Sequence, residues 1–130
     1  MARSSYSRQR PMGGGFELFA WYFMRISGLL LVLMALGHIV IMHIINSVEV
    51  INYAFVARRW AVPFWRVYDW ILLALGVLHG SNGIRVVIDD YVHHRGWRAF
   101  CTSALYVLAF VLLVMGTEVL LTFTPGVLPG

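Results

Sequence analysis

Three side chains that can do chemistry, those of His79, Asn82 and Arg85, lie in a stretch that is otherwise apolar enough to cross a membrane. Polar groups are costly in lipid, so each needs a partner or a function there. At about 100° per residue, the eleven steps from His79 to Asp90 place both side chains on one helix face, about 16 Å apart. If Asp90 and Tyr91 lie at a water interface, His79 lies near mid-membrane. A neutral imidazole there can ligate a metal or a haem iron, or bond to a neighbouring helix.

The composition predicts an all-α integral membrane protein. Of 130 residues, 60% are hydrophobic and 12% are charged, and the mean hydropathy is +0.76, far from the average soluble domain. Three apolar runs are each long enough for a membrane-spanning helix of roughly 20 residues. We therefore predict a three-helix membrane anchor over residues 16–124, with spans at about 16–45, 64–88 and 100–123, a polar tail at 1–15 and a short outer tail at 125–130.

The arginines predict the orientation of these helices. All ten basic residues are arginine; five lie before the first span or between the second and third, and three lie between the first and second. This distribution favours a cytoplasmic N-terminus and an outer C-terminus. The arginines are split among short segments and form no continuous groove. The formal charge of +4 therefore indicates topology and lipid headgroup contact, and no nucleic-acid partner.

Depth along the helices separates the polar residues inside the spans. At 1.5 Å per residue, Arg25 and Arg85 lie about 8 Å from the cytoplasmic boundary, His79 about 16 Å and His38 about 27 Å. His38 and His79 are therefore a poor pair of axial ligands for one iron, and His43 lies further out still; the roles of His38 and His43 stay open. Arg25 and Arg85 lie where the propionates of a haem bound to His79 could reach them. Alternatively, both arginines extend to the inner lipid headgroups.

The chain resembles the small hydrophobic membrane-anchor subunits of succinate dehydrogenase, respiratory complex II. The signature of that family, a histidine followed eleven positions later by aspartate and then tyrosine, stands here as His79, Asp90 and Tyr91. Arg25, within Met24–Gly28, matches the arginine of the family's first span. The resemblance extends over nearly the whole chain and looks closest to actinobacterial anchors.

Both anchors of the complex carry a histidine with an aspartate eleven positions later, and three further positions distinguish them. The cytochrome b anchor typically has a histidine directly before the first-span arginine, a serine four residues before it, and a histidine after the second-span arginine. Here these positions are Met24, Trp21 and Val86. All three departures favour the smaller anchor, so the chain is expected to supply only part of a quinone site.

The resemblance implies a bacterial plasma-membrane subunit that pairs with the cytochrome b anchor beneath a flavoprotein and an iron–sulfur subunit. His79 would be one axial ligand of a haem b shared between the anchors, with Arg25 and Arg85 at its propionates. Tyr91 and Asp90 would bind the substrate quinone, which receives electrons from succinate; Asp90 would orient Tyr91 or relay protons. The anchor itself is expected to supply no catalytic residue.

The cofactors that oxidise succinate and carry its electrons to the membrane are expected only in the partner subunits. The chain has neither a Gly-rich dinucleotide motif nor the cysteine spacing of a cluster site, and its single cysteine also excludes an internal disulfide. FAD and iron–sulfur clusters would therefore belong to the flavoprotein and the iron–sulfur subunit. A haem-free fumarate reductase anchor, a small membrane transporter that uses the buried arginines and histidine for a substrate path, and a purely structural anchor remain alternatives.

Overall fold

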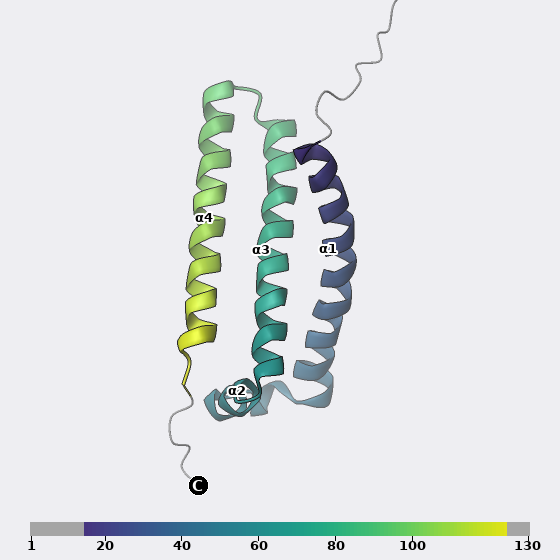
Figure 1. The fold of residues 1–130 in the computed structure, drawn as a ribbon, viewed down its shortest axis with the longest axis vertical. Coiled ribbons are helices and arrows are strands. Elements are labelled where there is room, and N and C mark those ends of the chain that lie inside the picture. The colour runs from purple at the N-terminus through teal and green to yellow at the C-terminus, as the bar shows by residue number, and fades with distance from the viewer. Residues whose placement is uncertain (1–14, 125–130) are drawn as a thin grey trace, which may run out of the picture.

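The computed structural model describes residues 15–124 and is helical over most of that range. Apart from Gly15, the predicted tails at 1–15 and 125–130 lie outside the described residues. The elements, in chain order, are α1 (Phe16–Ile39), a π-helical segment η1 (Val40–Ile45), a 3₁₀ turn η2 (Val48–Val50), α2 (Tyr53–Trp60), α3 (Pro63–Tyr91) and α4 (Arg95–Thr122) (Figure 1). The prediction of a helical protein is confirmed for these residues.

Three of the helices are long and apolar enough to cross a membrane, namely Leu18–Ile45, Pro63–Tyr91 and Arg95–Thr122. The prediction of three helices that are able to span a membrane is thus confirmed. Helix α3 continues three residues beyond the predicted end at 88, because helical hydrogen bonds do not stop where the apolar run stops. Asp90 and Tyr91 consequently belong to the last turn of α3.

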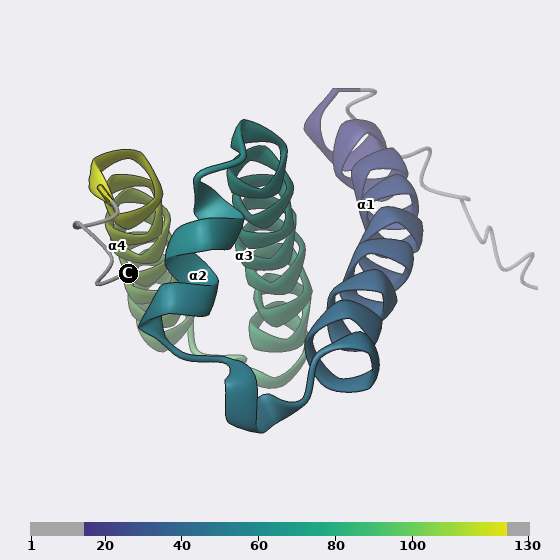
Figure 2. The ribbon, with the colours of Figure 1, turned by 90° about the horizontal axis from the view of Figure 1, so that it is seen from below.

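The long helices form an open layer. Figure 1 shows α3 between α1 and α4, and Figure 2, seen along the helices, shows a shallow arc rather than a closed bundle, with α2 lying across one end. We call this end of the layer the α2 end and the opposite one the Tyr91 end. The buried apolar residues of the described part are small in number: Ala20, Ala57, Ala109 and Leu120. Most large apolar side chains are exposed, as expected for surfaces that face lipid or other subunits.

Glycines allow close contact between the long helices. The hydroxyl of Tyr68 in α3 donates a hydrogen bond to the backbone oxygen of Met34 in α1. A Cβ at Gly37 would lie 3.1 Å from that hydroxyl. On the other side of α3, a Cβ at Gly116 of α4 would overlap the side chain of Leu73. Small residues thus set the helix spacing on both faces of α3.

A carboxylate holds α2 against α3. Asp69 accepts hydrogen bonds from Arg59 Nη2 and from Trp60 Nε1, both at 2.8 Å, and Arg59 is only 8% exposed. His38 Nδ1 of α1 lies 3.7 Å from the same carboxylate. The pairing satisfies a charge that would otherwise be buried alone, and it gives His38 a neighbour at the α2 end.

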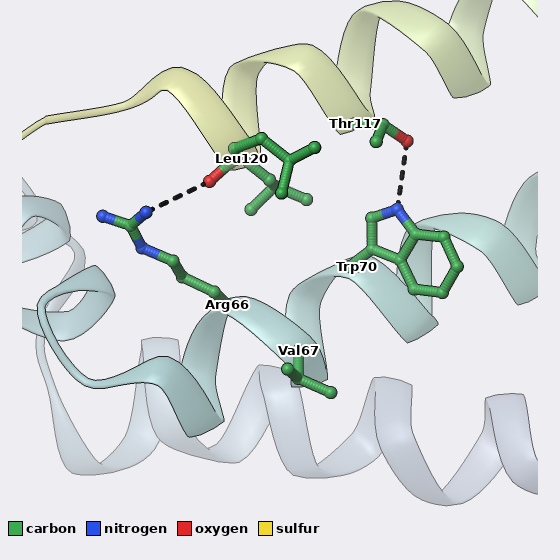
Figure 3. A pocket seen from close by; sticks show the side chains of 6 residues that line it. Arg66, Val67, Trp70, Thr117 and Leu120 are labelled. Carbon is green, nitrogen blue, oxygen red and sulfur yellow. Dashed lines mark hydrogen bonds between the residues drawn. The ribbon is translucent and has the colours of Figure 1, made fainter.

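Helices α3 and α4 are also joined at the α2 end. Arg66 donates to the backbone oxygens of Leu120, at 3.4 Å, and Phe123, at 2.8 Å. Trp70 Nε1 donates to Thr117 Oγ1 at 3.0 Å, and the two polar contacts frame an apolar pocket (Figure 3). The guanidinium thus satisfies carbonyls at the C-terminus of α4, where a cation is also favoured by the helix dipole.

Candidate functional site

His79 lies in the middle part of α3 with its ring against α1. At 1.5 Å per residue it is about 24 Å from Pro63 and about 18 Å from Tyr91 along the helix. Its Nδ1 is 2.8 Å from Ser27 Oγ, and a Cβ at Gly28 would lie 3.2 Å from its Cε1. The absence of a side chain at Gly28 therefore makes room for the imidazole.

The two ring nitrogens of His79 have different surroundings. Ser27 is 1% exposed, so its contact with Nδ1 is shielded from solvent. Within residues 15–124, Nε2 has no hydrogen-bond partner. A histidine that binds iron through Nε2 usually donates Nδ1–H to a polar group, so the residues present fit a haem ligand.

Two glycines of α3 leave part of its surface open. A Cβ at Gly76 or Gly80 would meet no atom of the described residues within 4 Å, whereas one at Gly83 would contact Met24 of α1 at 3.9 Å. Gly76 and Gly80 are therefore not used to pack α3 against its own neighbours. Another helix or a flat macrocycle could approach the backbone there.

Arg25 points away from the α1–α3 contact. It is exposed, and its guanidinium carbon lies 3.7 Å from the centroid of the Trp21 ring on the same helix. Two residues correspond to about 200° of helix rotation, which places Arg25 on the side of α1 opposite Ser27. The structure thus does not bring Arg25 next to His79 within this chain.

Arg85 is held by polar side chains of α3. Its Nε donates to Asn82 Oδ1 at 3.2 Å, and its Nη1 lies 3.5 Å from Asp89 Oδ2. Asp89 also lies 4.0 Å from Arg98 Nε in α4. Sequence reasoning overlooked this role of Asp89, although the i,i+4 spacing of Arg85 and Asp89 was a usable signal.

Tyr91 and Asp90 end α3 and face outward. Tyr91 is 79% exposed, Asp90 is exposed, and within residues 15–124 neither side chain has a hydrogen bond or an ion pair. Consecutive helical positions differ by about 100°, so the two side chains diverge. The expected orienting contact from Asp90 to Tyr91 is therefore not present in this chain.

Ser27 is the residue of this site that sequence reasoning missed. It lies fifty-two positions from His79, and no motif joins the two. Among the described residues, no group of three or more His, Cys, Asp or Glu could hold a metal ion. Within the described residues, the site therefore consists of one imidazole with a buried hydroxyl partner.

Known proteins resemble this chain over most of its length. A family model described as the succinate dehydrogenase/fumarate reductase transmembrane subunit matches residues 2–117. A relative from Archaeoglobus fulgidus, the succinate dehydrogenase hydrophobic membrane anchor subunit, is 36% identical over 98 residues, which cover 74% of this chain and 80% of the relative. The region matched by the family model contains all of the helices α1 to α3, with the Ser27–His79 pair. The chain therefore belongs to the family of succinate dehydrogenase and fumarate reductase transmembrane subunits.

Proposed function

We propose that this chain anchors a succinate:quinone oxidoreductase, ligates one haem b through His79 and forms part of a quinone site. One observation carries the haem assignment: His79 lies in the middle of a membrane-length helix with Nδ1 held by Ser27 and Nε2 without a partner in the described chain. Family membership supports the anchor role.

The open layer supports assembly with other subunits. Its exposed apolar faces and the uncrowded glycines of α3 suit a second anchor, the cytochrome b subunit, packed in the membrane. An iron–sulfur subunit and a flavoprotein would bind at the cytoplasmic surface and carry the clusters and FAD. The arginine distribution favours a cytoplasmic location for the Tyr91 end. The resemblance to actinobacterial anchors favours the plasma membrane of a bacterium.

A haem b at this site would add a one-electron carrier to the membrane domain. His79 would bind the haem iron through one ring nitrogen, and a histidine of the second anchor would be its partner ligand. His38 does not suit that position, because it lies beside Asp69, and Asp69 is about 15 Å from His79 along α3. Arg25 and Arg85 would pair with the propionates, since guanidinium groups bind carboxylates with charge-assisted hydrogen bonds.

Tyr91 would bind the quinone headgroup at the Tyr91 end. Its hydroxyl, unpaired within the described residues, can donate a hydrogen bond to a quinone oxygen and stabilise the negative charge that develops there during reduction. Asp90, on the adjacent position, would relay protons from the aqueous surface or bind the quinone through water. The Tyr91 end is also where an iron–sulfur partner would deliver electrons.

The test is the optical spectrum of the purified complex with His79→Ala. We expect loss or strong perturbation of the low-spin b-type spectrum, whereas His43→Ala, a change at an exposed histidine of η1, leaves it unchanged. An unaltered spectrum in His79→Ala would refute the ligand assignment. A wild-type complex that contains flavoprotein and iron–sulfur subunits but no haem would identify a haem-free fumarate reductase anchor instead. Purification without soluble partners would favour a transporter.

A further inference from the structure

We propose that Ser27 is a positioning residue for the haem ligand: its hydroxyl accepts the hydrogen bond of His79 Nδ1–H and fixes the tautomer that leaves Nε2 for iron. The inference rests on the proposed haem role of His79. Ser27 belongs to α1 and lies fifty-two positions before His79, whose tautomer it would fix.

The geometry restricts the imidazole from two sides. Ser27 Oγ lies 2.8 Å from His79 Nδ1. A Cβ added at Gly28 would lie only 3.2 Å from His79 Cε1. Ser27 is 1% exposed, which keeps bulk water from replacing its hydroxyl. Within residues 15–124 neither Ser27 Oγ nor His79 Nδ1 has another side-chain partner. The ring orientation therefore depends on this one hydrogen bond together with the close approach of α1 at Gly28.

The direction of the hydrogen bond decides whether His79 can bind iron. A neutral imidazole has one N–H and one lone pair. If the hydroxyl donates to Nδ1, the proton lies on Nε2 and blocks the ligand position. If the hydroxyl accepts from Nδ1–H, Nε2 carries the lone pair, and the hydrogen bond raises its basicity. A more basic ligand stabilises ferric over ferrous iron, so Ser27 would lower the haem midpoint potential.

The experiment compares Ser27→Ala, Ser27→Thr and Ser81→Ala in the whole complex. Threonine keeps the hydroxyl. Ser81 is the matched control, because it is also buried and lies two residues after His79 in α3, but has no hydrogen bond to it. Haem per assembled complex, the haem midpoint potential and the low-spin ferric electron paramagnetic resonance signal are measured for each variant.

We expect Ser27→Ala to raise the midpoint potential, change the ferric signal and weaken haem retention about ten- to a hundredfold, as removal of a ligand's hydrogen-bond partner commonly does. Ser27→Thr and Ser81→Ala should remain close to the wild type. Wild-type values in Ser27→Ala, or equal shifts in Ser27→Ala and Ser81→Ala, would overturn the proposal.

His79→Ala, measured in parallel, distinguishes the role of Ser27 from the role of His79 as the ligand. Loss of the haem spectrum in His79→Ala together with wild-type values in Ser27→Ala would refute the role of Ser27 and keep His79 as the ligand. An unchanged spectrum in His79→Ala would refute the ligand itself. Ser27→Thr that shifts as far as Ser27→Ala would assign the effect to packing at α1 rather than to the hydroxyl.

Discussion

Replacement of Tyr91 by phenylalanine separates the proposed quinone contact from every structural role. Tyr91 is 79% exposed, and within residues 15–124 its hydroxyl has no hydrogen-bond partner. The substitution removes one oxygen, leaves the ring in place and creates no cavity. We therefore expect the stability of the chain to change by no more than about 0.5 kcal/mol.

The magnitude of the functional effect follows from one hydrogen bond. If the hydroxyl donates to a quinone oxygen that becomes negative during reduction, its loss costs about 1 to 3 kcal/mol, because the acceptor remains without a partner. A change of about 1.36 kcal/mol in the activation free energy corresponds to a tenfold change in rate. Quinone reduction should consequently fall about ten- to a hundredfold.

The assay measures succinate oxidation with a quinone and with an artificial acceptor that takes electrons from the soluble subunits. Tyr91→Phe should lower only the first activity and leave haem content unchanged. Tyr106→Phe is the matched control, since Tyr106 is an exposed tyrosine of α4, with 46% exposure, and lines an apolar pocket together with Ser81 and Asn82.

Two results would contradict the reasoning. Unchanged quinone reduction in Tyr91→Phe would make Tyr91 an aromatic residue of the membrane interface and leave the quinone site to the partner subunits. An equal decrease of both activities, accompanied by loss of haem or of soluble subunits, would show that Tyr91 acts in assembly.

Two further predictions concern the haem. If His79 binds the haem, Gly28→Ala should shift the haem spectrum or potential, because its Cβ would lie 3.2 Å from the His79 imidazole. Gly37→Ala, with a similar 3.1 Å contact to a tyrosine hydroxyl, should cost about 1 to 3 kcal/mol of stability without a spectral change. Equal spectral effects of the two substitutions would contradict this. If the guanidinium groups of Arg25 and Arg85 pair with the propionates, Arg25→Leu and Arg85→Leu should each lower the midpoint potential. A positive charge at about 10 Å from the iron would favour the ferrous form by about 1 to 2 kcal/mol at an effective dielectric constant of about 20. Redox titration measures the shift, with exposed Arg58→Leu as the control; no shift for either would assign both arginines to the lipid headgroups.

The elements of the fold could be predicted because each is encoded locally. An apolar run longer than about 20 residues is sufficient to specify a membrane-length helix, and the structure contains three of them. The relation of His79 to Asp90 and Tyr91 could be predicted for the same reason, since all three lie in the single uninterrupted helix α3. Helical geometry then sets their separation without any knowledge of the neighbouring helices.

Contacts between helices could not be predicted, because the sequence does not state how two helices are aligned. Ser27 meets His79 only because α1 and α3 pack at one particular register, and a shift of one turn would move the hydroxyl by about 5 Å. Asp69 likewise binds Arg59 and Trp60 because α2 folds back across the end of the layer. Both pairings join elements whose relative positions arise from packing.

Arg25 shows why depth alone does not identify a contact. The sequence predicts the same depth in the membrane for Arg25 and Arg85. The rotation of α1, however, puts Arg25 on the side opposite Ser27, where its guanidinium lies over the Trp21 ring. A propionate of a haem bound to His79 would contact Arg25 only if that propionate extended past the edge of α1. Arg85, in contrast, lies on the same helix as the ligand and already pairs with the carboxylate of Asp89. A potential shift in Arg85→Leu without one in Arg25→Leu would therefore place the haem along α3, whereas shifts in both would require it to reach the outer face of α1.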